Sequence, residues 1–193
     1  MTCGKIAAMS GSASPSPRRV AILVEDDFED RELPVLLDAL HAAGLSVTSV
    51  GPAAGADYTG KRREATVRSD MAAGAAKIKD FDVVVVPGGY APDRMRMRHA
   101  MVDLVRDALE AGKPVAAIDR GVQLLITVHA LRDRTATCWP SVAIDVKNAG
   151  GKYVDRPVVE DGPVITARKW DDIPLFCDAI RRAVERPAAQ AAP

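Results

Sequence analysis

Three short stretches in which almost every residue is apolar limit what this chain can fold into. They are residues 20–24, 83–86 and 114–118, and the second consists of four valines. A strand with apolar side chains at every position, rather than at every second one, is covered on both faces. Each stretch is followed by a segment whose apolar side chains recur at helical spacing. This alternation predicts an α/β sandwich, with a parallel sheet and helices on both faces.

The rest of the chain continues the same alternation. The first expected helix has Leu33, Leu36 and Leu40 on one stripe and ends at Gly44. Further strands are expected at 45–50, 65–68, near 158 and near 164, and further helices over 101–109, 121–130, 141–148 and 173–184. We expect one domain over residues 19–186. A leader rich in glycine, serine and proline at 1–18 and a tail at 187–193 are expected to be flexible.

Composition excludes several classes of function. Lys plus Arg and Asp plus Glu both number 26, so the formal charge is zero, which argues against binding to nucleic acid or to an anionic membrane. Aromatic residues make up only 4%, which leaves few surfaces on which bases could stack. No apolar run approaches the ~20 residues that a membrane helix needs. A small molecule is therefore the expected partner.

The three cysteines indicate the compartment and exclude some sites. Cys3, Cys138 and Cys177 are odd in number and far apart, so a disulfide framework is not expected. No two of them have the spacing of metal ligands, and no metal site is predicted. The pattern is typical of a reduced, cytoplasmic chain. His41, His99 and His129 all lie in expected helices and are interpreted as structural.

Functional residues should follow the three apolar strands, because parallel sheets bind ligands outside the carboxyl ends of their strands. The segment after the first strand is acidic, with Glu25, Asp26, Asp27, Glu29, Asp30 and Glu32. Acidic residues at a helix start ordinarily serve the helix dipole. Glu29 and Glu32, however, are three residues apart, on one face of a helical turn. We expect both to point toward the same crevice.

Residues 20–47 also resemble the opening of a response-regulator receiver domain, in which paired acids hold a metal ion beside a phosphorylated aspartate. That family needs its aspartate at the end of the third strand. Here the valine strand continues into Pro87, and no aspartate occupies the position. A phosphoacceptor function is therefore not supported.

Two junctions have the form of reactive loops. Residues 117–121, AIDRG, place small residues two before and two after Asp119, as a nucleophile elbow requires for its sharp turn. The alternative role for Asp119 is an ordinary helix N-cap. Pro87-Gly88-Gly89 ends the valine strand and could present a backbone N–H to developing negative charge, or form only a turn.

In order along the chain, these segments resemble the ThiJ/PfpI superfamily, relatives of class I glutamine amidotransferases. The match runs over 19–185 and includes FEDREL, DVVVVPGGYAPD, GKPVAAIDRGVQLL, TATCWP, NAGGKYVD and DGPVITAR. The resemblance implies a flavodoxin-like fold and a homo-oligomer, either a dimer or a hexamer. Family enzymes have AICHG where this chain has AIDRG. Asp119 therefore corresponds to the nucleophilic cysteine and Arg120 to the following histidine, which excludes thiolate chemistry at the elbow.

Other site residues are also implied by this resemblance. Glu32, with Glu29 beside it, is the carboxylate that contacts the elbow residue. The N–H groups of Gly89 and Arg120 form the oxyanion site.

The resemblance also implies roles for Asp93 and Trp139, and Tyr90 is expected to act beside them. Asp93 matches an acid that reaches across a subunit interface in protease-like members. Trp139 lies where members carry a pocket-lining aromatic residue or histidine, and Tyr90 is expected to shape the same pocket. The arginines at 94, 96 and 98 are expected to be solvated or at a subunit contact, or else to bind an anionic substrate.

These residues suggest a cofactor-independent enzyme that acts on a small molecule. Two neighbouring carboxyl groups cannot easily both ionise, so one of Asp119 and Glu32 should hold a proton at neutral pH. Such a pair offers an acid and a base for a lyase, hydratase, isomerase or cyclase-like reaction.

Four alternatives remain open from the sequence. Asp119 could attack covalently, although no histidine is placed to activate water afterwards. The two carboxylates could hold a divalent cation, although two ligands are few for such a site. Cys138 could serve as a substitute nucleophile. Finally, the chain could be a degenerate member that works as a binding, chaperone or regulatory module.

Overall fold

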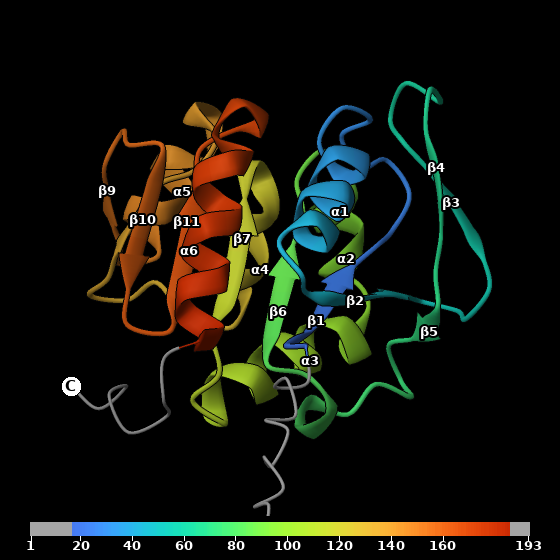
Figure 1. The fold of residues 1–193 in the computed structure, drawn as a ribbon. Coiled ribbons are helices and arrows are strands. Elements are labelled where there is room, and N and C mark those ends of the chain that lie inside the picture. The colour runs from blue at the N-terminus through green and yellow to red at the C-terminus, as the bar shows by residue number, and fades with distance from the viewer. Residues whose placement is uncertain (1–16, 186–193) are drawn as a thin grey trace, which may run out of the picture.

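The computed structural model describes residues 17–185, and a seven-stranded sheet runs through the middle of them (Figure 1). In pairing order its strands are β10 (Val158–Asp161), β11 (Val164–Ala167), β7 (Val115–Ile118), β6 (Val83–Val86), β1 (Arg19–Leu23), β2 (Ser46–Gly51) and β5 (Met71–Ala72). The three apolar stretches of the sequence correspond to β1, β6 and β7, which are adjacent at the centre of the sheet. The leader and tail expected at the two ends fall outside the described residues, apart from positions 17 and 18.

Nearly all strands run parallel, which confirms the predicted α/β sandwich. In the register, Val20 of β1 lies opposite Val47 of β2 on one side and Val83 of β6 on the other. The exception is β10, which is antiparallel to β11. Only Gly162 and Pro163 separate these two strands, and two residues can form a hairpin turn but not a crossover. The sheet is therefore parallel, as predicted, except at this edge.

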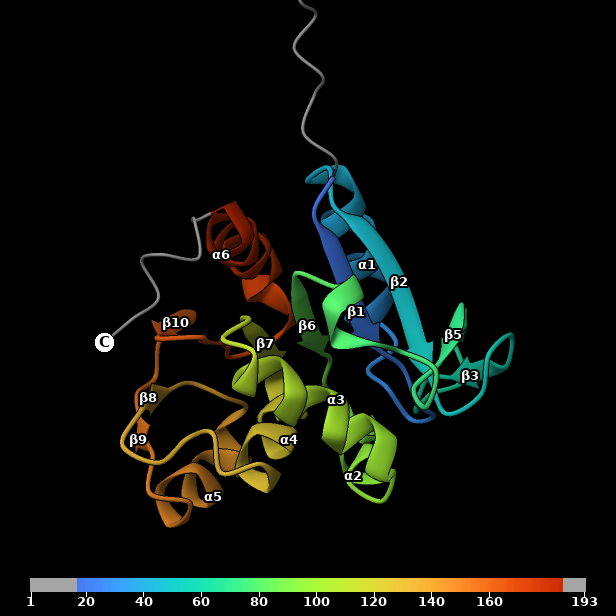
Figure 2. The same cartoon turned by 90° about the horizontal axis from the view of Figure 1, so that it is seen from below.

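Helices cover both faces of the sheet (Figure 2). One face carries α1 (Leu33–Ala42) and α6 (Ile173–Glu185), which pack against each other. The other face carries α2 (Ala91–Met95), α3 (His99–Glu110), α4 (Val122–Thr127) and α5 (Ala143–Asn148). Short 3-10 turns lie at Ile78–Asp80, Asp119–Gly121, Pro140–Val142 and Trp170–Asp172. Among residues 17–185, no helix combines the length and the apolar character needed to cross a membrane.

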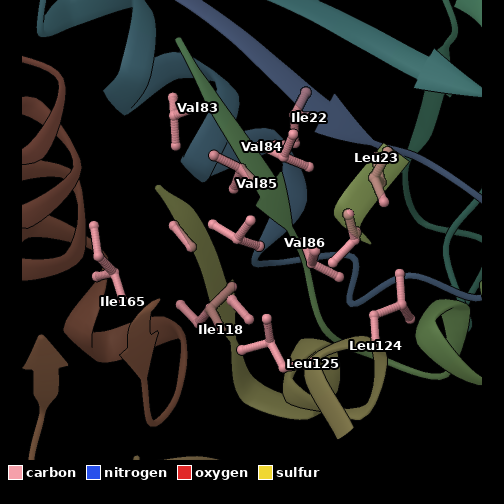
Figure 3. Packing of buried hydrophobic residues seen from close by; sticks show 14 of the residues in the cluster. Ile22, Leu23, Val83, Val84, Val85, Val86, Ile118, Leu124, Leu125 and Ile165 are labelled. Atoms are coloured by element: carbon pink, nitrogen blue, oxygen red, sulfur yellow. The ribbon is translucent and has the colours of Figure 1, made fainter. Parts of the chain in front are cut away.

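The core lies between the central strands and these helices (Figure 3). All four valines of β6 are fully buried, because successive side chains of a strand point to opposite faces and both faces are covered. On one side, Leu124 and Leu125 of α4 pack into this layer, and both are 0% exposed. Burial of each such side chain contributes about 1.5–3 kcal/mol, which makes this layer the main source of stability.

Several short elements were not predicted. β3 (Asp57–Thr59) and β4 (Thr66–Arg68) form a hairpin that stands away from the main sheet beyond β2 (Figure 1). β8 (Thr135–Ala136) pairs with β9 (Lys152–Tyr153). Only the strand near 65–68 was expected from the sequence. Two or three residues are too few to show the alternation by which a strand is recognised.

The helix expected over 121–130 is shorter than predicted. It begins only after the 3-10 turn that follows β7, and it ends at Thr127. Just beyond it, His129 has a φ of 58°, a left-handed conformation that stops helical hydrogen bonding. Apolar residues continue to 131, but they pack as part of a turn. Periodicity alone therefore overextended this helix.

Candidate active site

A cavity of about 260 Å³ opens at the carboxyl ends of the central strands. Strand β2 is added on one side of β1 and β6 on the other, so the loops after β1 and β6 diverge and leave a crevice between them. The residues that line the cavity are Glu29, Arg31, Glu32, Lys61, Arg62, Gly89, Asp119, Arg120, Trp139, Lys169 and Trp170. Six of these were predicted from the sequence. The other five are Arg31, Lys61, Arg62, Lys169 and Trp170.

Asp119 occupies a sharp turn between β7 and the helical segment that follows. Its φ is 57°, in the left-handed region that aspartate tolerates better than most residues. The neighbours are small because nothing larger fits. A Cβ on Gly121 would collide with the Val86 carbonyl oxygen, and one on Gly88 would lie 2.5 Å from the Cβ of Asp119. The chain thus has the geometry of an elbow at the residue that the sequence suggested.

The carboxylate of Asp119 accepts hydrogen bonds from the backbone. The Gly89 N–H donates to Oδ2 at 2.9 Å, and the Arg120 N–H donates to the same carboxyl group. These are the two amides expected to form an oxyanion site. In this structure they stabilise the side chain of Asp119 itself.

Glu32 lies close enough to this group to feel its charge. It is 1% exposed, at the start of α1, and its Oε1 accepts a hydrogen bond of 2.5 Å from the Gly88 N–H. Burial, and then the nearby charge of Asp119, raise the pKa of Glu32 to about 8. Burial also raises the pKa of Asp119, although the Gly89 and Arg120 amides oppose it. With both pKa values raised, the pair retains a proton at pH values at which two isolated carboxyl groups would both be ionised.

Two cationic side chains that line the cavity come from the loop of the β3–β4 hairpin. Lys61 forms an ion pair with Glu29, and Arg62 follows it at the rim. The loop is held by Asp30, whose carboxylate accepts backbone hydrogen bonds of 2.8–3.1 Å from Arg62, Glu64 and Ala65. The sequence carried no sign of this arrangement, because residues 30 and 62 are brought together only by the fold.

Tyr90 is exposed and is not one of the lining residues. Its ring is 4.9 Å from the Arg120 guanidinium carbon and 5.3 Å from Lys61 Nζ, both measured to the ring centre. Such cation–π contacts position the two cations. Tyr90 therefore contacts two lining residues, and the expectation that it shapes the pocket stays a prediction.

Trp139 lines the cavity, and its backbone N–H donates a hydrogen bond of 3.2 Å to the Asp119 carbonyl oxygen. Asp93 does not line the cavity. It is exposed on α2, and its expected role across a subunit interface stays a prediction.

The arginines that follow Asp93 make contacts within the chain. Arg94 pairs with Asp27 and Arg98 with Glu25, and Arg96 donates to the Thr127 hydroxyl at 2.9 Å. All three arginines are exposed, as expected, and Arg94 and Arg98 also connect α2 and the segment after it to the loop after β1.

Cys138 does not suit the role of a nucleophile. It is fully buried, and burial, with smaller effects from Asp119 and Asp145, raises the pKa of its thiol to about 12. Cys177 is buried among the apolar side chains of α6, and Cys3 lies outside the described residues. Within residues 17–185, no three His, Cys, Asp or Glu side chains are arranged to hold a metal ion.

Comparison with known proteins gives a consistent result. The profile of the DJ-1/PfpI family, also called ThiJ/PfpI, matches residues 18–183. Protein/nucleic acid deglycase 2 of Escherichia coli is 38% identical over 160 residues, which cover 82% of this chain and 93% of that one.

Solved structures match in fold as well as in sequence. DJ-1beta of Drosophila melanogaster superimposes with a TM-score of 0.79 at 27% identity, over 91% of this chain and 96% of that one. A two-domain protein of Anabaena variabilis, with DJ-1/ThiJ/PfpI-like and ferritin-like domains, matches with a TM-score of 0.83 at 38% identity. That match covers 91% of this chain but 50% of the other, so this chain spans half of the two-domain protein. The profile, the sequence identity and the fold agree, and this chain belongs to the DJ-1/PfpI family.

Proposed function

We propose that this protein is a cofactor-independent enzyme that uses Asp119 and Glu32 as a base and an acid on a small molecule. The observation that carries the proposal is the pair itself. Both residues contribute to the cavity lining, and Glu32, which is buried, has a pKa raised to about 8 by burial and by the charge of Asp119. A group whose pKa lies near neutral pH can both hold and release a proton during turnover.

The two carboxyl groups have different environments and therefore different roles. The charged form of Asp119 is stabilised by the Gly89 and Arg120 amides, which suits it to accept a proton from a substrate C–H group. Glu32, protonated, donates to the substrate oxygen. An isomerisation then proceeds through an enediol, and an elimination releases the protonated hydroxyl as water. In both cases the substrate loses one proton to Asp119 and gains one from Glu32, so the protons balance.

The relationship to a deglycase does not by itself define this activity. The resemblance places a nucleophilic cysteine at the elbow of family enzymes, whereas this chain has Asp119 there. Cys138, the nearest alternative thiol in the sequence, is buried and stays protonated. We therefore assign the chemistry to carboxylates rather than to a thiolate.

Hydrogen exchange tests the proposal before the natural substrate is known. The protein is incubated in D₂O with a panel of small 2-oxo acids and hydroxy ketones, and deuterium incorporation is followed by NMR. We expect exchange with the wild type, and a loss of about 100-fold or more for Asp119→Asn and Glu32→Gln. Asparagine tolerates the left-handed backbone, so the elbow should survive.

Two control variants make this test specific. Cys138→Ala should leave the exchange rate unchanged, and so should Asp38→Asn on the exposed face of α1. If Asp119→Asn exchanges substrate as fast as the wild type, Asp119 is not the base.

One observation favours a second function, that of a binding or regulatory module. The Gly89 and Arg120 amides, which would stabilise developing charge on a substrate, already bind the Asp119 carboxylate. A module of this kind would bind a small molecule in the cavity without exchange or turnover. Ligand binding by the wild type in the absence of any deuterium incorporation would favour it.

A further inference from the structure

The rim of the cavity carries an excess of positive charge. Five cationic side chains line it, against three carboxylates. Two of these carboxyl groups, Glu32 and Asp119, form the buried pair at the base, and the third, Glu29, is neutralised by Lys61. A chain with equal numbers of acidic and basic residues has therefore concentrated cations at one opening.

Three of the rim cations form no ion pair within residues 17–185. These are Arg31, Arg62 and Arg120, which come from the turn before α1, from the hairpin loop and from the elbow. Several arginines outside the cavity do pair with carboxylates, as Arg94 and Arg168 do with Asp27 and Asp155. Guanidinium groups that line a cavity outside any ion pair are suited to bind an oxyanion from outside, although the Arg120 charge also acts on the neighbouring Asp119 carboxylate.

The rim is held in place before any ligand arrives. Asp30 fixes the backbone of the hairpin loop at Arg62, and the Tyr90 ring holds Arg120. Preorganised donors lose less conformational entropy on binding than mobile ones.

An aromatic surface completes the site. The chain has two tryptophans, Trp139 and Trp170, and both line this cavity. They are 36% and 45% exposed, which is unusual for such large apolar side chains. Their rings offer a flat apolar contact beside the arginines. The cavity volume of about 260 Å³ suits a small molecule.

We propose that this cavity binds a small organic anion, whose carboxylate or phosphate group is held by Arg31, Arg62 and Arg120 while its carbon skeleton contacts the tryptophans. The proposal rests on the proposed function only in treating this anion as the substrate; binding itself does not require catalysis. A carboxylate held by the arginines places the adjacent carbon within the cavity that Asp119 lines.

Because both tryptophans lie at the site, their fluorescence reports on binding. The full-length protein is titrated with benzoate, phenyl phosphate and benzamide, which share a ring and differ in charge. We expect saturable changes with the two anions and at least tenfold weaker binding of neutral benzamide. The anion that binds with the higher affinity shows whether a carboxylate or a phosphate is preferred, and either result supports the proposal. Binding of benzamide within threefold of both anions would overturn it.

Variants locate the anion. Arg31→Gln combined with Arg62→Gln should weaken anion binding about tenfold or more. Arg63→Gln, which removes a charge from the same loop outside the cavity lining, should change it less than twofold and controls for folding and net charge. Equal affinity of the double variant and the wild type would contradict the assignment.

The same measurement separates this proposal from the catalytic one. Asp119→Asn removes a negative charge from the cavity, so it should abolish exchange while leaving anion binding unchanged or tighter. If anions bind as described but Asp119→Asn still exchanges substrate, only the acid–base proposal fails. If deuterium exchange depends on Asp119 but the charge of the ligand does not affect its binding, only the anion proposal fails.

Discussion

At the scale of single residues, Asp119 combines a left-handed backbone with a carboxylate that two backbone amides stabilise. The two properties are connected, because the elbow turns the side chain back toward the Gly88–Gly89 loop. Gly89 itself has a φ of 76°, and a Cβ there would lie 2.5 Å from the Phe28 carbonyl carbon. Three backbone segments thus meet more closely than side chains would allow, and the acid–base pair depends on that approach.

Gly121 gives the clearest test of this close packing. In Gly121→Ala the new methyl group would lie 2.9 Å from the Pro87 carbonyl oxygen and even closer to that of Val86, and a backbone atom cannot rotate away. We expect a loss of about 1–3 kcal/mol in the free energy of unfolding. Gly74→Ala, where no atom lies within 4 Å and φ is not positive, should change stability by less than about 1 kcal/mol. Urea denaturation of both variants provides the comparison, and equal midpoints would contradict the close-packing account.

The residues found from the sequence are those whose role is local. Asp119 and Gly89 are flanked by small residues after strong apolar strands, a pattern that a short window of sequence contains. Lys61, Arg62 and Trp170 carry no such pattern, because a charged or aromatic residue in a loop looks the same whether it faces solvent or a cavity. Only the hairpin and the turn before α6 bring these side chains to the rim.

At the scale of elements, the β3–β4 hairpin is fastened by the acidic segment after β1. The Asp26 carboxylate accepts from the Thr59 N–H at 2.9 Å, and the Lys61 N–H donates to the Phe28 carbonyl at 2.9 Å. Asp30 holds the loop between the two strands. The acids that the sequence analysis assigned to helix capping or to a crevice therefore also act as backbone acceptors for a distant hairpin.

Asp30→Asn should loosen this hairpin. Burial alone would raise the pKa of Asp30, but the amides of Arg62, Glu64, Ala65 and Asp30 itself outweigh burial and hold the pKa below its usual value. An amide side chain has one oxygen and no charge, so the backbone N–H groups lose acceptors. We expect faster hydrogen exchange at the amides of Arg62, Glu64 and Ala65, and anion binding weakened severalfold.

The control for this variant is Asp38→Asn, on the exposed surface of α1, which should alter neither quantity. Unchanged exchange at the loop amides in Asp30→Asn would show that the hairpin is held by its strands alone. Because the folded pKa of Asp30 is lowered, the stabilisation is present above its ordinary value of 3.8 and is lost as the pH falls through the folded pKa.

Elements were predictable in proportion to their length and burial. β1, β6 and β7 are apolar at nearly every position and could be found without a structure. The hairpin strands have only three residues each, and α2 has five, so neither shows a period. The antiparallel direction of β10 follows from the length of a turn rather than from the strand sequence. The central sheet was therefore predictable, whereas the elements that bring cations to the site were not.

At the scale of the whole molecule, a neutral chain contains a strongly polarised site. Carboxyl groups lie at the base of the cavity and unpaired arginines at its rim, so their charges cancel in the total but not locally. A buried acid also affects global stability, because its protonation differs between the folded and unfolded chain. Glu32 links the proposed chemistry to the stability of the entire domain.

The sign of this linkage can be derived and measured. Glu32 has a pKa of about 8 in the folded chain against an ordinary 4.5, so between these values the folded form holds a proton that the unfolded form has lost. The stabilisation is complete below 4.5 and is lost as the pH rises toward 8, with a slope of at most about 1.4 kcal/mol per pH unit from this group. Asp119, whose pKa is also raised, acts in the same direction.

Urea denaturation from about pH 5 to pH 9 at constant ionic strength should show this decline in the wild type. Glu32→Gln can still accept the Gly88 N–H but cannot ionise, so its stability should depend much less on pH over that range. The advantage of the variant over the wild type should therefore grow as the pH rises. Parallel curves for the two proteins would mean that Glu32 ionises normally, and the assignment of Glu32 as the proton donor would then have to be abandoned.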